Sequence, residues 1–207
     1  MTRLIDRTLA DLLAAFRSSD PTPGGGSASA LSGAVGASLL AMVAALPKPR
    51  AEREADVERL RSAGGRCAVL SDRLAALVDR DTEAYEAVVA AYRRPKTTDE
   101  EKASRTAAIQ AAMRGAIETP LDVMRECQAA IEEGVVVVTF GNRNATSDVR
   151  VAIDLLLAGL RGARYNVEIN LMSVKDVEYA ESATREAARL TTDAERAAHE
   201  AHFLAVT

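Results

Sequence analysis

The residues best suited to bind a small molecule form the run Pro21–Ser27, in which two prolines frame a threonine and three glycines precede a serine. Consecutive glycines let the backbone approach a ligand closely, because they carry no side chain. The first N–H groups of a following helix favour a polar or anionic group. The run lacks the Gly-Lys-Ser/Thr ending of a phosphate-binding loop, and no strand-like segment precedes it as a dinucleotide fingerprint requires. The pattern predicts a small-molecule loop of another kind.

Asp81 is the acidic side chain that could take part in catalysis. It lies four residues before Tyr85, so the two share a helical face with Ala84 and Val88. A carboxylate on a mostly apolar face is costly to bury unless it is paired or takes part in chemistry. From the residues alone, a carboxylate at the rim, paired with a neighbouring arginine, is the simpler interpretation.

Lys96 and Arg105 are cations that could meet an anion or polarise a carbonyl. Lys96 follows Pro95 at a break between helices, where a tight turn could hold it in place. Arg105 lies among alanines, which leave room for its guanidinium to fold inward. Lys96 could equally be a solvated lysine in an exposed loop, and Arg105 a surface charge. For both residues the functional and the structural interpretation stay open.

Five further polar residues lie in the second half of the chain: Asn142, Asn144, Asp148, Asn166 and Asn170. Gly-Asn-x-Asn is common in turns, because asparagine bonds its own main chain. The other two asparagines, spaced four apart, place two amides on one face of an apolar helix. Buried amides need partners, so a ligand and a structural network remain equal alternatives.

Composition limits the class of protein. Of the 207 residues, 48% are hydrophobic but only 3% aromatic, and the net charge is −4. This mixed charge argues against a nucleic-acid surface. Two cysteines and two histidines provide no metal-ligand spacing, and they suit a reduced, cytoplasmic compartment. The uncharged segment 21–47 raises the alternative of a membrane span, but its Gly, Ala and Ser content favours a buried helix of a soluble bundle.

The periodicity predicts one all-α domain over residues 1–207, a helical bundle with a long central apolar helix. Val135–Phe140 is rich in β-branched residues, but a lone strand would have no partner, so helix is expected there. Proline, glycine and capping signals divide the chain. The expected segments are Leu4–Phe16, Ser27–Leu46, Ala51–Tyr92 with a weak point at Gly64-Gly65, Thr98–Ile117, a new start at Thr119-Pro120, a turn at Gly141–Thr146, Ser147–Met172, and a last helix capped by Ser173 with Asp176.

Together these motifs resemble the cyclodeaminase/cyclohydrolase family of folate enzymes. The resemblance extends from about Leu4 to Thr192. It rests on five motifs in the same order: Pro-x-Pro-Gly-Gly-Gly-Ser, Asp-x-Glu-Ala-Tyr, Pro-Lys-x-Thr-x-Glu-Glu-Lys with Arg105 and Ile109-Gln110, Gly-Asn-x-Asn with Ser147-Asp148, and Asn166-Val167-x-Ile169-Asn170.

The resemblance implies an all-helical homodimer that binds a tetrahydrofolate derivative as substrate near the subunit interface, with no separate cofactor, metal, membrane or nucleic acid. It also reverses the interpretation of Asp81, which becomes the expected catalytic acid, assisted by Tyr85 and Lys96. The expected substrate-binding residues are Pro23, Gly24, Gly25, Gly26, Ser27, Arg105, Asn142, Asn144, Asp148, Asn166 and Asn170. One departure is Pro47-Lys48-Pro49-Arg50, where a longer polar stretch is expected.

The implied reaction is hydrolysis of 5,10-methenyltetrahydrofolate to 10-formyltetrahydrofolate. Two alternatives stay open: a formiminotetrahydrofolate cyclodeaminase that releases ammonia, and a non-catalytic helical module that binds folate.

Overall fold

The protein is described here over residues 3–206 of a computed structural model, and within that range it is all helical, as expected. The α-helices are α1 (Leu9–Phe16), α2 (Gly25–Ala45), α3 (Glu54–Tyr92), α4 (Asp99–Phe140), α5 (Thr146–Leu171) and α6 (Val177–Leu204). Two short 3-10 helices, η1 (Leu4–Asp6) and η2 (Arg143–Ala145), precede α1 and α5.

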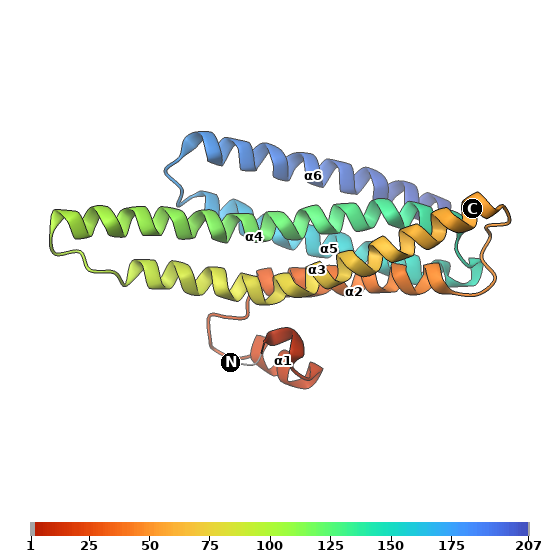
Figure 1. The fold of residues 1–207 in the computed structure, drawn as a ribbon, viewed down its shortest axis with the longest axis horizontal. Helices are drawn as coiled ribbons and strands as arrows, with labels where there is room; N and C mark the ends of the chain where they lie inside the picture. Colours follow the sequence, from red (N-terminus) through yellow and green to blue (C-terminus); the bar gives the residue numbers. More distant parts are fainter. Residues whose placement is uncertain (1–2, 207) are drawn as a thin grey trace.

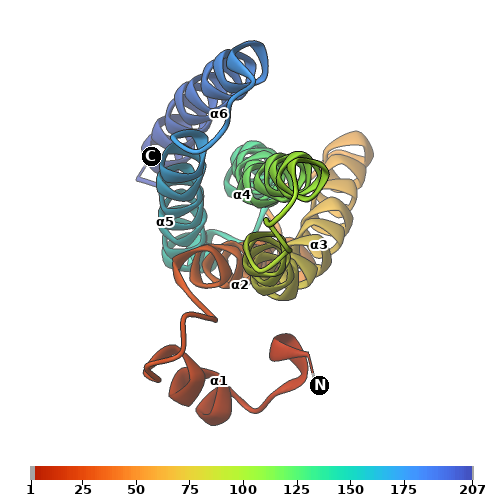
Figure 2. The ribbon, with the colours of Figure 1, turned by 90° about the vertical axis from the view of Figure 1, so that its left-hand side faces the viewer.

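The long apolar helix α2 packs against α3, α5 and α4 (Figure 1). Leu40 and Ala37 are fully buried in a core shared by these helices. By length and hydropathy α2 would qualify as a membrane span, and 44% of its apolar window is buried in the bundle. Figure 2 shows α6 on the outside of α5 and α4, and α1 set apart from the bundle below α2.

Helix α4 is longer than the sequence signals indicated, and α3 runs without a break from Glu54 to Tyr92. The weak point at Gly64-Gly65 does not interrupt α3, and Gly64 lies so close to α2 that an added Cβ would stand 2.7 Å from the Ala44 side chain. The expected new start at Thr119-Pro120 is wrong, because α4 continues through Pro120. Val135–Phe140 is helical, as expected, at the end of α4.

Several helix starts also differ from the expected capping residues. The first helix was expected to begin near Leu4, but α1 begins at Leu9. Thr8 caps it by accepting a hydrogen bond from the Asp11 N–H. Gly24 precedes α2, so Ser27 lies inside its first turn. Asp176 alone caps α6 by accepting from the Tyr179 N–H. The expected cap at Ser147 is wrong, since α5 begins at Thr146. The capping box of Thr98 and Glu101 on α4 is confirmed.

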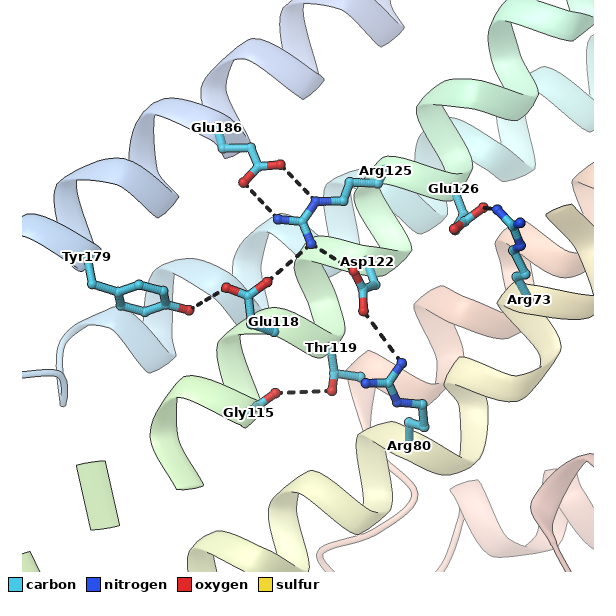
Figure 3. A network of polar contacts seen from close by, with 10 residues as sticks. All are labelled: Arg73, Arg80, Gly115, Glu118, Thr119, Asp122, Arg125, Glu126, Tyr179 and Glu186. Atoms are coloured by element: carbon cyan, nitrogen blue, oxygen red, sulfur yellow. Dashed lines mark hydrogen bonds and ion pairs between the residues drawn. The ribbon is translucent and has the colours of Figure 1, made fainter. Parts of the chain in front are cut away.

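A network of charged side chains fixes α6 and α3 on α4 (Figure 3). Arg125 of α4 bonds Glu186 of α6 through two nitrogens, each at 2.8 Å, and Asp122 at 2.7 Å. Asp122 is also paired with Arg80 of α3 at 3.5 Å. Of the three helices joined by these contacts, α3 and α4 also border the candidate site.

Candidate active site

A cavity of about 390 Å³ lies where the beginning of α2 meets the later turns of α3, the first half of α4 and the end of α5. It brings together residues from three of the five motifs. Those bordering it are Pro21, Thr22, Gly24, Gly25, Gly26, Asp81, Ala84, Tyr85, Val88, Tyr92, Met113, Ala116, Asn166, Asn170 and Ser173. Asp81 is the only member of this lining with a charged side chain.

Asp81 is held by the first turn of α2. Its Oδ2 accepts hydrogen bonds from the Ser27 backbone N–H at 2.8 Å and from the Ser27 hydroxyl at 2.9 Å. Burial raises the pKa of the Asp81 carboxyl above its ordinary value, and the two hydrogen bonds from Ser27 oppose that rise. A carboxyl whose pKa is raised accepts a proton more readily than an exposed aspartate, which suits a general base.

Ser27 is fully buried behind Asp81, so the expectation that it contacts the ligand is not met within this chain. Its hydroxyl lies 2.9 Å from both Asp81 Oδ2 and the Val78 carbonyl, but a hydroxyl carries one proton. With Asp81 ionised, Ser27 donates to the carboxylate. With Asp81 protonated, the acid can donate to Ser27 Oγ while Ser27 donates to Val78. Both protonation states of Asp81 therefore keep hydrogen-bond partners.

Of the glycines before Ser27, Gly26 is the one that this close packing requires. A Cβ on Gly26 would lie 2.0 Å from Oδ1 and 2.5 Å from Cγ of Asp81, so the carboxyl would have to leave its position against Ser27. A Cβ on Gly25 would lie 3.8 Å from Asn166 Nδ2, an ordinary contact at the cavity wall. Gly26 therefore lets α2 begin directly against the carboxylate of α3.

The two asparagines of α5 border the cavity, as expected. Asn166 donates from Nδ2 to the Gly162 carbonyl of its own helix at 2.9 Å. Asn170 donates from Nδ2 to the Ala116 carbonyl of α4 at 2.8 Å. Both contacts use the donor end of the amide, and the acceptor Oδ1 atoms have no partner among residues 3–206. The structure thus combines the two alternatives, a structural contact and a group available to a ligand.

Lys96 and Arg105 do not border the cavity. Lys96 lies exposed in the loop between α3 and α4. Arg105 folds onto the end of α3, where its Nε and terminal nitrogen donate to the Tyr92 carbonyl at 3.1 and 3.0 Å and its guanidinium lies 5.5 Å from the centre of the Tyr92 ring. It therefore supports a residue of the cavity wall.

The remaining expected residues lie elsewhere. Pro23 borders a second cavity of about 860 Å³, between the N-terminal segment and α3. Asn142 shapes the turn after α4, because its side chain accepts from the Asn144 N–H at 2.9 Å and donates to the Pro47 carbonyl at 2.6 Å.

With Asp148, these asparagines lie at the other end of the bundle. The 24 residues of α4 between Ala116 and Phe140 span about 36 Å at 1.5 Å per residue. The prediction that Asn142, Asn144 and Asp148 join the site is therefore not met within one chain.

Sequence reasoning placed Val88 on the face of Asp81 but missed Tyr92, Met113, Ala116 and Ser173. Tyr92 and Val88 continue the face of Asp81 and Tyr85 along α3, so the helical spacing contained their signal. Met113 and Ala116 reach the site through the pairing of α4 with α3 and α5, which no local pattern indicates. Within residues 3–206 no three His, Cys, Asp or Glu side chains gather as a metal site would require.

Comparisons with known proteins identify the family of this chain. The family model described as formiminotransferase-cyclodeaminase matches residues 8–189. A methenyltetrahydrofolate cyclohydrolase from Methylorubrum extorquens is 40% identical, and the alignment covers 91% of each chain. The rat formimidoyltransferase-cyclodeaminase is 31% identical over 92% of this chain, which corresponds to 35% of the rat protein.

The fold has a counterpart among solved structures. The crystal structure of formiminotetrahydrofolate cyclodeaminase from Thermotoga maritima superposes with a TM-score of 0.80 and 27% sequence identity over 96% of each chain. The shared fold covers the helices that build the Asp81 cavity. The family model, the relatives and the fold together show that this chain belongs to the formiminotransferase-cyclodeaminase family.

Proposed function

We propose that this protein hydrolyses 5,10-methenyltetrahydrofolate to 10-formyltetrahydrofolate in one-carbon metabolism. The observation that carries the proposal is the half-buried carboxyl of Asp81, which faces a cavity with no other charged side chain. The substrate bears a positive charge on the carbon between N5 and N10, so a carboxylate in a poorly solvated cavity stabilises it where the reaction occurs. The 40% identical Methylorubrum relative, similar over 91% of each chain, supports this reaction.

In the proposed mechanism, Asp81 acts first as a base. It takes one proton from a water molecule as the water oxygen bonds to the cationic carbon, which gives a neutral tetrahedral intermediate. Asp81 then returns its proton to N5 as the carbon–N5 bond breaks. The remaining hydroxyl proton of the intermediate leaves to solvent as the formyl carbonyl forms on N10. The Ser27 hydroxyl can follow these changes by switching between Asp81 and Val78.

Other residues bind and orient the substrate in this proposal. Tyr85 borders the cavity one helical turn after Asp81, and we assign it the orientation of Asp81 or of the water molecule. Gly24 and Gly25 expose backbone at the cavity wall, and the two asparagine Oδ1 atoms accept from N–H groups of the pterin ring. We assign Lys96 an assisting role in proton transfer, for which its side chain must reach the substrate from the exposed α3–α4 loop. The reaction as written uses no cofactor.

We further propose that the protein is a cytoplasmic homodimer in which a second copy covers the outer face of α2. This helix carries no charged residue, yet Val35 and Met42 are 44% and 41% exposed on it. Uncharged faces of this kind are typical of subunit interfaces. Asn142, Asn144 and Asp148 lie far from the Asp81 cavity of their own chain. In a dimer they could instead approach the Asp81 cavity of the partner subunit.

The second candidate is a formiminotetrahydrofolate cyclodeaminase, which the Thermotoga structural relative favours. That reaction also passes through a tetrahedral carbon, but N10 attacks and ammonia leaves, so the same Asp81 chemistry serves. A third possibility is a non-catalytic module that binds folate.

One experiment separates the three functions. The purified protein is incubated with 5,10-methenyltetrahydrofolate and, separately, with 5-formiminotetrahydrofolate; loss of methenyl absorbance and release of ammonia are measured against the uncatalysed rates. Faster methenyl hydrolysis without ammonia release supports the proposal. Ammonia release from the formimino substrate shows the cyclodeaminase, and binding without either reaction shows the module.

A further inference from the structure

Pro120 leaves a backbone carbonyl without its helical partner at the wall of the Asp81 cavity. It is a buried residue inside α4. Because proline has no backbone N–H, the carbonyl four residues earlier, that of Ala116, lacks the donor that every other residue type would supply. Ala116 borders the cavity, so this carbonyl is not deep in the core.

Asn170 of α5 supplies the missing donor. Its Nδ2 lies 2.8 Å from the Ala116 carbonyl oxygen, and its side chain borders the same cavity. The side-chain amide is planar, with the donor and the acceptor on the same carbon. Once Nδ2 is held by Ala116, the direction of Oδ1 is fixed as well.

The contact of Asn170 differs from that of Asn166. Asn166 bonds the Gly162 carbonyl within its own helix, so its contact needs no other element. The contact of Asn170 joins two helices and depends on the residue at position 120. Gln110 of α4 separately holds the segment after α5, donating to the Ser173 carbonyl at 3.2 Å and accepting from the Lys175 N–H at 2.8 Å. Loss of the Asn170 contact therefore changes an amide direction without detaching α5.

We propose that Pro120 is a positioning residue: by freeing the Ala116 carbonyl, it fixes the Asn170 amide so that Oδ1 accepts a hydrogen bond from the substrate. The inference rests on the proposed function for the nature of that substrate, a reduced pterin whose ring and amino N–H groups are donors. Pro120 itself does not border the cavity.

The test is Pro120→Ala, which returns an N–H to Ala116 and displaces Asn170. We expect KM for 5,10-methenyltetrahydrofolate to rise about five- to tenfold, the usual value of one hydrogen bond, while kcat changes less than about twofold. The Tm should not fall, because alanine is favoured over proline inside a helix. The matched control is Gly115→Ala, one residue before Ala116 on an exposed part of α4, where an added Cβ meets nothing within 4 Å. It should leave KM unchanged.

Asn170→Ala provides the second variant. It should raise KM as much as Pro120→Ala, and the double variant should be no worse than Asn170→Ala, because both changes remove one interaction. An unchanged KM in Pro120→Ala, or fully additive effects in the double variant, would overturn the inference.

A spectroscopic readout separates this inference from the proposed function. In ¹⁵N NMR spectra of the ligand-free protein, the Asn170 side-chain amide protons should exchange slowly with solvent, and Pro120→Ala should abolish that protection. Unprotected amide protons in the unsubstituted protein would refute the contact even if the protein is active. Protected protons in a protein that does not hydrolyse the substrate would refute the proposed function and leave the contact standing.

Discussion

At the scale of single residues, the environment of Asp81 balances two opposing effects. Burial favours its protonated form, and the two Ser27 hydrogen bonds favour the carboxylate. Because the folded pKa is raised above the unfolded value of about 4, the contribution of Asp81 to stability is complete only below that pH and is lost as the pH rises through the folded pKa. The ionised form of Asp81 therefore costs stability in the folded protein, which is common where a group serves catalysis.

Ser27→Ala tests this balance. Loss of the hydroxyl removes an interaction that lowers the pKa of Asp81, so the pKa rises further. Because the proposed base must be ionised, the acid limb of the pH profile of kcat/KM should move to higher pH. The matched control is Ser32→Ala on the same helix, where the lost hydroxyl bonds the Leu155 carbonyl at 2.8 Å and not Asp81. An acid limb that stays in place in Ser27→Ala, or that shifts equally in Ser32→Ala, would argue against Asp81 as the base.

At the scale of helices, small residues determine how closely α2 and α5 approach. A Cβ on Gly36 would lie 2.7 Å from the Ala152 carbonyl oxygen and 2.8 Å from Leu156 Cγ, and a Cβ on Gly159 would lie 2.7 Å from the Ser29 carbonyl oxygen. Backbone atoms cannot move aside as a flexible side chain can. The approach of these helices places the α5 asparagines opposite the glycine loop.

Gly36→Ala should therefore destabilise the bundle. Forcing a methyl group into this contact costs about 2–3 kcal/mol, which corresponds to a Tm about 5–10 °C lower for a chain of this length. Gly65→Ala on α3 is the control, because an added Cβ meets nothing within 4 Å there. It should raise the Tm slightly through its higher helix propensity. Equal Tm values for the two variants in thermal unfolding would contradict this account of the packing.

The comparison of prediction with structure also belongs at this scale. Apolar periodicity and capping residues identified the helices, including Val135–Phe140, whose β-branched run is stabilised as helix by burial of Val137 and Val138. Local signals failed at Pro120, where tertiary packing and the Asn170 amide offset the lost helical bond. Local signals failed at Gly64-Gly65 as well. Gly64 does not interrupt α3; it allows α3 to pack closely against α2. Such effects depend on partners that are distant in the sequence.

For the site, the motifs predicted Asp81, Tyr85, the glycines and the α5 asparagines, which the fold brings to one cavity. They could not indicate the distance to Asn142, Asn144 and Asp148, because that depends on α4 being one uninterrupted helix. Nor could the motifs show that Ser27 contacts Asp81 on the side away from the cavity, since this depends on how α2 and α3 cross.

At the scale of the whole molecule, the outer face of α2 is the apolar surface that a homodimer should cover. The wild-type protein should have twice the chain mass of 22.0 kDa in light scattering. Val35→Glu places a charge on this face and should yield monomers, since an unpaired charge in an apolar interface is costly. Val69→Glu on α3, at a similarly exposed position, should leave the dimer intact. A Val35→Glu protein that keeps the wild-type mass would place the interface elsewhere.

The central claim, that Asp81 carries hydrolysis of 5,10-methenyltetrahydrofolate, is tested most directly by comparing the wild-type protein with Asp81→Asn. Asparagine keeps the size of the side chain and an acceptor for Ser27 but cannot take up the proton, and the loss of a buried charge should leave the Tm at pH 7 unchanged or higher. We expect substrate to bind while kcat falls by about 10²–10⁴-fold, the usual contribution of a general acid–base group. An Asp81→Asn protein that hydrolyses 5,10-methenyltetrahydrofolate at the wild-type rate would contradict the account.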